Sequence, residues 1–582
     1  MYSVQERREG NGKNIFIILV NQILAMNNYD VIVVGSGISG GWAAKELTEK
    51  GLKTILLERG RDVKHVKDYP TANLDPWELP NRNMLTQEDM KTYSIQKNVY
   101  HFGQDDKHFF IKDSDHHYEQ VKPFQWVQGN QVGGKSLLWS RHTFRLSDLD
   151  FEANMKEGIG IDWPIRYKDI EPWYDHVERF IGVSGKNEGL PQLPDGQFIP
   201  PFEMNCMEKH LKKRIEEKFK ERNLIESRMA VLTQPHNGRG KCQSRNLCHR
   251  GCPYGAYFSS NSSTLPAAYE TGNLTLRPFS IVHSIIWDKE KNKATGVRII
   301  DAETMETAEY FAPIIFLNAS ALNTTRIMMQ SKSETFPDGF ANSSGVLGHY
   351  LMDHYSGAGA LAGYNDLEDQ YYAGQRSTSV YVPRFQNLKG QDRSYKRGFA
   401  YEVYVSRDDW TRGYSSPGAG AEWKDSLSEP GSWSAYMEAY GECLPEFKNR
   451  VWPDETKKDK WGLPILNIEM EYGENEKLMR GDMKKAAKEM LETSDPAWVI
   501  EVDNTPVPGS VIHEMGTARM GNDPKTSVLN KFNQCHDAPN VFITDGACMV
   551  STACQNPSLT YMALTARACD YAVEKLKRGE IK

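Results

Sequence analysis

Residues 29–40, YDVIVVGSGISG, decide the fold. The first half of this stretch is a short apolar run rich in β-branched residues, which predicts a buried parallel strand. The glycines that follow have the G-x-G-x-x-G spacing of a dinucleotide-binding turn. The first glycine allows the tight turn, the second lets a pyrophosphate approach the backbone, and the third lets the helix and the strand pack closely.

The next residues complete the pattern. The composition of residues 42–50 predicts a helix, which Gly51 ends because glycine tolerates a positive φ. A second predicted strand, residues 53–57, leads to Glu58, where an acidic side chain accepts hydrogen bonds from a ribose. The alternative to a dinucleotide site is a glycine-rich turn between a strand and a helix that binds no ligand. We predict a dinucleotide site that includes Gly35, Gly37, Ile38, Ser39, Gly40, Glu58 and Arg59.

Two later segments favour FAD over NAD. Residues 129–136, GNQVGGKS, form another loop that exposes its backbone, and residues 541–546, VFITDG, read as a strand that delivers an acidic residue and a glycine. An NAD site is usually completed within its own βαβ repeat, whereas segments spread over the chain point to a large and permanently held cofactor. The additional FAD contacts that we expect are Gly129, Gly133, Gly134, Ser136, Asp545, Gly546, Asn556 and Pro557.

Three further motifs follow, at residues 294–297 (ATGV), 314–318 (IIFLN) and 513–521 (HEMGTARMG). Together with the glycine turn and the two later segments, they resemble the motifs of the glucose-methanol-choline (GMC) family of FAD oxidoreductases. The motifs occur in the order found in that family, and the resemblance covers nearly the whole chain. The sequence is most similar to the sugar-oxidising branch, which includes pyranose oxidase and bacterial glucose, fructose, gluconate and glucoside 3-dehydrogenases. The resemblance implies an α/β fold: a Rossmann-like FAD-binding domain interleaved with an α+β substrate domain built on an antiparallel sheet.

Two positions depart from the family pattern. Leu138 stands where pyranose oxidase has a histidine that bonds covalently to the flavin, so we expect non-covalent FAD. The strand that normally ends Ala-Ala-Gly ends here as Asn318-Ala319-Ser320.

The resemblance implies that His513 is the general base and that Asn556 is its partner at the flavin. The chemistry agrees, because histidine has an ordinary pKa near ~6.5 and takes up a proton near neutral pH. A neutral asparagine amide can hydrogen-bond the same substrate oxygen and hold it in place. Pro557 would stiffen the neighbouring backbone. The alternative for His513 is a core histidine. We read His354, in the segment LMDH, as structural.

Three cysteines cluster as Cys242-x5-Cys248-x3-Cys252-Pro253. Three thiolates on a tight loop suit an iron–sulfur cluster, and three ligands suit the 3Fe-4S form. The resemblance also implies such a cluster, which in related dehydrogenases passes electrons from the flavin to a haem subunit. There are two alternatives to a cluster. One is a zinc ion bound by these cysteines with His249 as the fourth ligand. The other is a disulfide between two of the three cysteines, with the third thiol free.

A cluster would make the enzyme a dehydrogenase that oxidises a secondary hydroxyl of a sugar or glycoside to a ketone, with carbon 3 of a glucoside as the first choice. The expected partners are then a small accessory subunit and a cytochrome c-type acceptor. The alternatives are an oxygen-using pyranose or alcohol oxidase and a non-catalytic electron-relay flavoprotein subunit.

The 582 residues carry a net charge of -7, which argues against a nucleic-acid partner, and no stretch is long and apolar enough to span a bilayer. We find no convincing export signal. The expected location is the cytoplasm, or the periplasm if the chain is co-exported with an accessory subunit.

An aromatic stretch is a candidate wall on which sugar rings would stack, and a charged run is predicted to be the solvated face of a helix. The wall comprises Trp410, Trp423, Trp433, Tyr436 and Tyr440, and the charged run is residues 474–488.

The expected domain ranges are these. The FAD-binding domain takes residues 27–170, 225–345 and 500–582, the substrate domain takes 170–225 and 345–500, and residues 1–26 are an extension.

Overall fold

The computed structural model describes residues 27–367, 370, 379–414 and 417–581. The expected extension, residues 1–26, lies outside the described residues. Among the described residues, no helix combines the length and the apolar character that a bilayer crossing requires.

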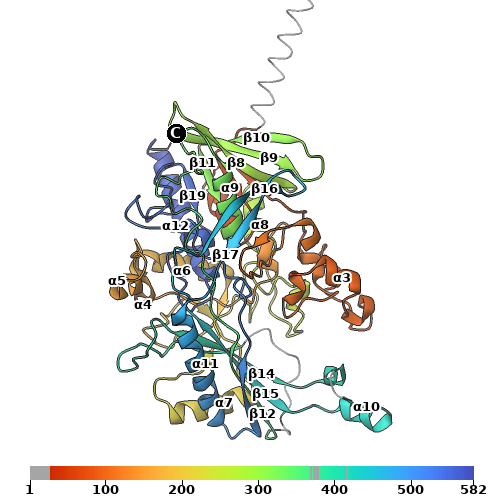
Figure 1. Cartoon of the computed structure of the whole chain (residues 1–582). Coiled ribbons are helices and arrows are strands. Elements are labelled where there is room, and N and C mark those ends of the chain that lie inside the picture. Colours follow the sequence, from red (N-terminus) through yellow and green to blue (C-terminus); the bar gives the residue numbers. More distant parts are fainter. Residues whose placement is uncertain (1–26, 368–369, 371–378, 415–416, 582) are drawn as a thin grey trace, which may run out of the picture.

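The nucleotide half of the molecule, which lies at the top in Figure 1, is built on a five-stranded parallel sheet in the order β19-β11-β1-β2-β7. The residues of β1, β2, β11 and β19 are fully buried, as expected for a parallel sheet covered on both faces. This confirms the predicted strands and the α/β class. The strands are β1 (Val31–Val34), β2 (Thr54–Leu57), β7 (Leu274–Arg277), β11 (Ile314–Leu317) and β19 (Val541–Ile543).

Two helices from opposite ends of the sequence pack together against this sheet. They are α2 (Ile38–Glu49), which directly follows the glycine turn, and the C-terminal α12 (Ser558–Lys577). Their contact brings the segment that precedes α12, with Asn556 and Pro557, next to the first βαβ unit. A three-stranded antiparallel sheet, β8 (Ser280–Asp288), β9 (Lys293–Asp301) and β10 (Thr307–Phe311), lies at the same end of the molecule.

The other half is a six-stranded sheet in the order β18-β12-β15-β14-β13-β6, with every pair antiparallel. The helix α11 (Glu474–Glu492) packs against it through a buried face that includes Met479 and Met483. The charged run is therefore the outer face of a half-buried helix. The strands are β6 (Ile225–Glu226), β12 (Ala358–Tyr364), β13 (Val380–Val382), β14 (Phe399–Arg407), β15 (Trp433–Gly441) and β18 (Trp498–Asp503).

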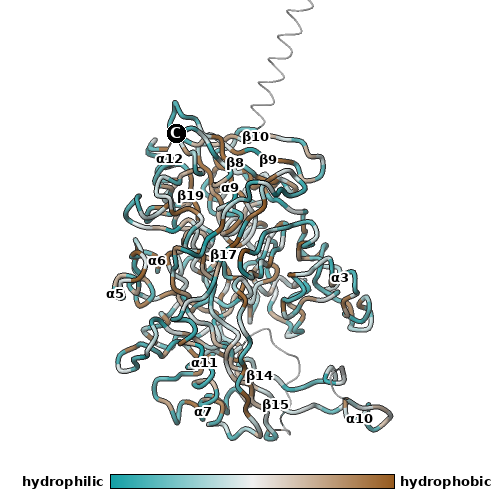
Figure 2. Tube along the Cα trace, in the orientation of Figure 1, coloured by the Kyte–Doolittle hydropathy of each residue, from teal (hydrophilic) through white to brown (hydrophobic). Residues whose placement is uncertain are grey.

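A third, small sheet belongs to the nucleotide half. The hairpin of β16 (Arg450–Lys458) and β17 (Pro464–Glu469) pairs with β3 (Glu119–Gln120) and shares its apolar core with the parallel sheet. Figure 2 shows apolar residues concentrated along the strands of both halves and hydrophilic residues at the periphery. The expected domain ranges stay a prediction. This hairpin lies within the range expected for the substrate domain but belongs to the nucleotide-side core. Conversely, β6 lies within the range expected for the FAD-binding domain but belongs to the antiparallel sheet.

The helices not yet named are α3 (Gln87–Thr92), α4 (Asp148–Phe151), α5 (Ala153–Glu157), α6 (Tyr167–Ile181), α7 (Cys206–Lys218), α8 (Thr264–Glu270), α9 (Ala321–Gln330) and α10 (Ala421–Ser428).

Candidate functional site

One large cavity is lined by the nucleotide half and by loops from other parts of the chain, and its empty space, part of it open to solvent, is about 1840 Å³. Its wall contains residues from the glycine turn, from the 129–136 loop and from both C-terminal motifs. His513 and Asn556 therefore face the same space as Gly35 and Gly37. Of the predicted site residues, those that line the cavity are Gly35, Gly37, Ile38, Ser39, Glu58, Arg59, Gly129, Gly134, Ser136, His513, Asp545, Gly546, Asn556 and Pro557.

The three glycines of the turn serve different purposes. A Cβ on Gly40 would lie 1.7 Å from the Gly35 carbonyl oxygen, so this position needs glycine for packing and does not line the cavity. A Cβ on Gly37 would meet no protein atom within 4 Å. Gly37 is also the N-cap of α2 and has no side-chain cap, so the backbone amides of the helix N-terminus face open space. Such a terminus favours an anionic phosphate.

Glu58 is buried at the end of β2. Its carboxylate accepts hydrogen bonds from the Ser36 backbone N–H (3.0 Å), the Ser36 hydroxyl (2.6 Å) and the Gly60 N–H (2.9 Å). Burial raises the pKa of Glu58 above its usual value, although these hydrogen bonds oppose the shift. The carboxylate is thus held at the wall of the cavity beyond the phosphate position, as a ribose contact requires.

The 129–136 loop approaches the same turn. Gly133 has a φ of 94°, and its N–H donates to the Ser36 hydroxyl over 3.0 Å. A Cβ at Gly133 would lie 1.7 Å from the Asn261 side-chain oxygen. Gly133 therefore allows the loop to pack closely against Asn261 and does not line the cavity, whereas Gly134 and Ser136 do. Leu138, the position of the histidine in pyranose oxidase, also lines it.

The departure at Asn318-Ala319-Ser320 does not prevent the close approach of the backbone. A Cβ on Gly35 would lie 2.4 Å from the Asn318 carbonyl oxygen, so the backbone segments at Gly35 and Asn318 are in close contact. Ser320 takes a φ of 76°, a conformation that glycine adopts without strain, and it caps α9. The serine therefore follows the path of the usual glycine, at some cost in backbone strain.

The cavity contains polar atoms that the protein itself does not satisfy. Asn130 Nδ2, Asn318 Nδ2, Glu514 Oε1 and the Tyr561 hydroxyl are buried, line the cavity and have no hydrogen-bond partner within the described residues. Buried polar groups without partners are costly, and each calls for an explanation such as an absent ligand. Together with the open helix terminus, these atoms fit a large and polar cofactor such as FAD.

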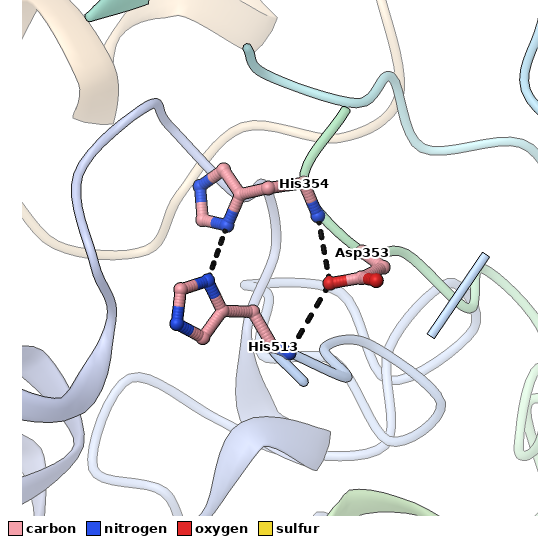
Figure 3. A group of neighbouring side chains, drawn as sticks. All are labelled: Asp353, His354 and His513. Carbon is pink, nitrogen blue, oxygen red and sulfur yellow. Dashed lines mark hydrogen bonds between the residues drawn. The ribbon is translucent and has the colours of Figure 1, made fainter. Parts of the chain in front are cut away.

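At the other end of the cavity, His513 lies beside a buried histidine (Figure 3). His354 Nδ1 is 2.9 Å from His513 Nδ1, and His354 Nε2 is 3.0 Å from the Ala553 carbonyl oxygen. His513 lines the cavity, whereas His354 lies behind it and is 1% exposed. Burial, followed by His354, Lys135 and His142, holds the pKa of His513 well below its usual value.

Asp353 organises the loop that carries His513. One of its oxygens accepts the backbone N–H groups of His354 (2.9 Å) and His513 (3.1 Å), and the other accepts those of Gly509 (2.8 Å) and Val511 (3.3 Å). Burial, followed by the nearby Glu514 carboxylate, raises the pKa of Asp353 to about 7. The close group of Asp353, His354 and His513 is held by its own hydrogen bonds, so a metal ion is not needed to explain it.

The neighbours of Asn556 were not identified from the sequence. Glu402 of β14 lies close to the Asn556 side chain, and its Oε1 is 2.7 Å from His142 Nδ1. Burial acts to raise the pKa of Glu402, but His142, Tyr404 and Asn556 hold it below its usual value. Because a carboxylate only accepts hydrogen bonds, Glu402 favours the orientation in which the Asn556 amide NH₂ points toward it.

Glu402 also lies directly opposite Glu438 of β15 in the register of the antiparallel sheet. Two like charges in opposed positions destabilise a sheet. Burial, followed by the Glu402 charge, raises the pKa of Glu438. Only the strand register reveals it, because the two glutamates are far apart in the sequence.

The aromatic wall is partly wrong. Trp433 is 2% exposed and packs in the core of the antiparallel sheet, because alternate residues of β15 point to opposite faces. Tyr436 and Tyr440 lie on the other, half-buried face. Trp410 belongs to a short 3-10 helix and Trp423 to α10, both between β14 and β15.

Cys242, Cys248 and Cys252 line one small second cavity with Tyr257 and Gly251. None of the nine cysteines, all of which are described, forms a disulfide. The three sulfur atoms do not all lie within 4.8 Å of one another, whereas a tetrahedral zinc ion with 2.3 Å bonds holds its sulfurs about 3.8 Å apart. A cluster binds each thiolate through a different iron, so it suits a wider spacing.

Comparison with known proteins identifies the family. The chain matches the GMC oxidoreductase family models over residues 29–356 and 445–565. It is 28% identical to 2-methyl-1,2-propanediol dehydrogenase of Mycolicibacterium austroafricanum, covering 93% of this chain and 94% of that protein. It is 25% identical to the fructose dehydrogenase large subunit of Gluconobacter japonicus, covering 94% and 98%.

Among solved structures, pyridoxine 4-oxidase from Mesorbium loti superposes with a TM-score of 0.58 at 16% identity, over 94% of this chain and 99% of that one. That likeness concerns the fold alone. The chain belongs to the GMC oxidoreductase family, whose members bind FAD, and it is an oxidoreductase that acts on CH–OH groups. The predicted family and fold class are confirmed.

Proposed function

We propose that the protein is an FAD-dependent dehydrogenase that oxidises a secondary hydroxyl of a sugar or glycoside to a ketone. One observation carries this proposal: His513 and Asn556 line the same cavity as the nucleotide-binding glycines. The similarity to fructose dehydrogenase supports a sugar substrate. Carbon 3 of a glucoside remains the first choice by resemblance.

Each residue of the site has a role in this reaction. Gly37 and the N-terminus of α2 hold the pyrophosphate, and Glu58 holds a ribose. When bound, FAD supplies the acceptor for the hydride that leaves the carbinol carbon. His513 takes the hydroxyl proton, and it is neutral near pH 7 because burial lowers its pKa. Asn556 donates a hydrogen bond to the same oxygen, while Glu402 fixes the orientation of its amide.

The test is an anaerobic titration of the purified protein with a panel of sugars and glycosides, followed in the visible spectrum. We expect at least one compound to bleach the flavin. His513→Ala should abolish bleaching while FAD stays bound, and the matched control His117→Ala, at an exposed histidine, should leave it intact. Equal bleaching in wild type and His513→Ala would refute the role of His513. Stoichiometric peroxide with oxygen as the sole acceptor would favour the oxidase alternative.

We also propose that Cys242, Cys248 and Cys252 hold a 3Fe-4S cluster, which would pass electrons to a cytochrome c-type acceptor on a partner subunit. The support is their shared cavity and the absence of disulfides among the nine cysteines, all of which are described. The fructose dehydrogenase relative is itself named as a large subunit. Iron and sulfide analysis with EPR tests the proposal. Cys248→Ser should lose the signal, and Cys206→Ser should retain it; iron-free protein from iron-replete cells would refute the cluster.

A further inference from the structure

The contact between His354 and His513 determines where the protons on both rings lie. The two Nδ1 atoms are 2.9 Å apart, and the ring planes meet edge to face at 81°. A hydrogen bond between two imidazole nitrogens requires one of them to carry a hydrogen and the other a lone pair. The distance alone does not say which ring is the donor.

The carbonyl of Ala553 resolves the direction. It lies 3.0 Å from His354 Nε2, and a carbonyl oxygen can only accept, so His354 carries its hydrogen on Nε2. A neutral imidazole has a single N–H group. His354 Nδ1 is then a bare acceptor, and His513 Nδ1 must be the donor. His513 Nε2 is consequently left with its lone pair.

Both rings are neutral under physiological conditions. Burial lowers the pKa of His354 to about 4. Burial, then His354, Lys135 and His142, hold the pKa of His513 well below its usual value. The acidic groups nearby are Asp353, whose oxygens are occupied by backbone N–H groups, and Glu514, which pairs with Lys135 at 2.7 Å. A third is Glu402, which lies 2.7 Å from His142 Nδ1 and acts to raise the pKa of His354 against the larger effect of burial. Among the described residues, none of these carboxylates hydrogen-bonds a ring nitrogen of His354 or His513.

We propose that His354 is a positioning residue that fixes the tautomer of His513, so that the Nε2 lone pair is the base presented to the cavity. This deepens the proposed function and rests on it. The substrate hydroxyl gives its proton to His513 Nε2, and an imidazolium forms whose Nδ1–H still bonds His354.

The arrangement also stops the proton at His513. Beyond His513, the ring of His354 meets backbone groups of Ala553 and Thr552, and a backbone carbonyl does not accept a proton at neutral pH. The proton must therefore leave through the cavity, on the side of His513 Nε2. Asp353 keeps both rings in register, because one of its oxygens binds the backbone N–H of each histidine.

Long-range ¹H–¹⁵N NMR of the ¹⁵N-histidine-labelled holoprotein tests the tautomer without a substrate. The His513 signals are assigned by their loss in His513→Asn. We expect a protonated Nδ1 and an unprotonated Nε2 in the wild type at pH 7. A proton on Nε2 would overturn the proposal without any variant of His354.

Two variants test the cause. His354→Asn places an amide oxygen where Nδ1 accepts, so the His513 tautomer should persist. His354→Leu removes the acceptor, so both tautomers should appear. A single Nδ1–H tautomer in His354→Leu, with wild-type FAD absorbance and Tm, would overturn the proposal; a leucine variant that does not fold leaves the wild-type and asparagine spectra to decide.

A kinetic arm uses methyl α-D-glucopyranoside and a dichlorophenolindophenol acceptor. We expect His354→Leu to lower kcat by about 100-fold with little change in KM, and His354→Asn to restore most of it. Equal kcat in wild type and His354→Leu would overturn the proposal. If even the wild type leaves this glycoside unoxidised, the failure falls on the proposed substrate, because the NMR result reports the histidine pair independently.

Discussion

Replacing Gly37 by alanine would separate cofactor binding from folding. Gly37 has a φ of -66°, which any residue adopts, and an added Cβ would meet no protein atom within 4 Å. The protein itself therefore tolerates the methyl group. Gly and Ala at an N-cap differ by about 0.5–1 kcal/mol, so the stability of the apoprotein should change little.

The cofactor is affected more strongly. The methyl group occupies the space above the N-terminus of α2, where the pyrophosphate is expected. If two charge-assisted hydrogen bonds from the helix amides are lost, at about 1.5–3 kcal/mol each, binding weakens by about 3–6 kcal/mol. At about 1.4 kcal/mol per decade, the Kd for FAD should rise by at least about 100-fold.

The assay is a titration of the apoprotein with FAD, followed by quenching of tryptophan fluorescence, with the Tm of the apoprotein as the measure of folding. The matched variant is Gly40→Ala, whose Cβ would overlap the Gly35 carbonyl at 1.7 Å. That variant should lose stability. Wild-type FAD affinity in Gly37→Ala would refute this reasoning, as would an equal fall in Tm in both variants.

Two further predictions follow from electrostatics. Lys135→Gln removes a positive charge that lowers the pKa of His513, so the acid limb of kcat/KM should move to higher pH; a limb that stays in place would contradict this. Burial alone would raise the pKa of Glu46, but His176 and two lysines lower it to about 2. Because this folded-state pKa is depressed, Glu46 stabilises the fold by about 3 kcal/mol at pH 7, and the contribution disappears as the pH falls from about 4.5 toward 2. Glu46→Gln should therefore lower the guanidinium midpoint at pH 7 and approach the wild type in acid; a gap that does not depend on pH would count against the charge.

Much of the fold was predictable because its signals are local. The apolar run of β1, the glycine spacing and the acidic residue after β2 are properties of a βαβ unit that is continuous in the sequence. Trp433 shows where such reasoning fails. Because it lies in a stretch rich in aromatic residues, the sequence favours a role in binding sugar. In the structure, the alternation of side chains along β15 points Trp433 into the core. The motif with His354 was noticed, yet its contact with His513 spans 159 residues and leaves no trace in spacing.

The sequence by itself determined the family, the dinucleotide-binding unit and the candidate histidine and asparagine, because short-range backbone geometry needs particular residues at particular offsets. Only the tertiary structure decided what surrounds them. Asp353 and His354 contact His513, Ala553 contacts His354, and Glu402 lies close to Asn556, because the parallel and antiparallel sheets bring distant loops to one cavity. The tautomer and the pKa of His513 depend on those neighbours and on burial, which are properties of the packed molecule.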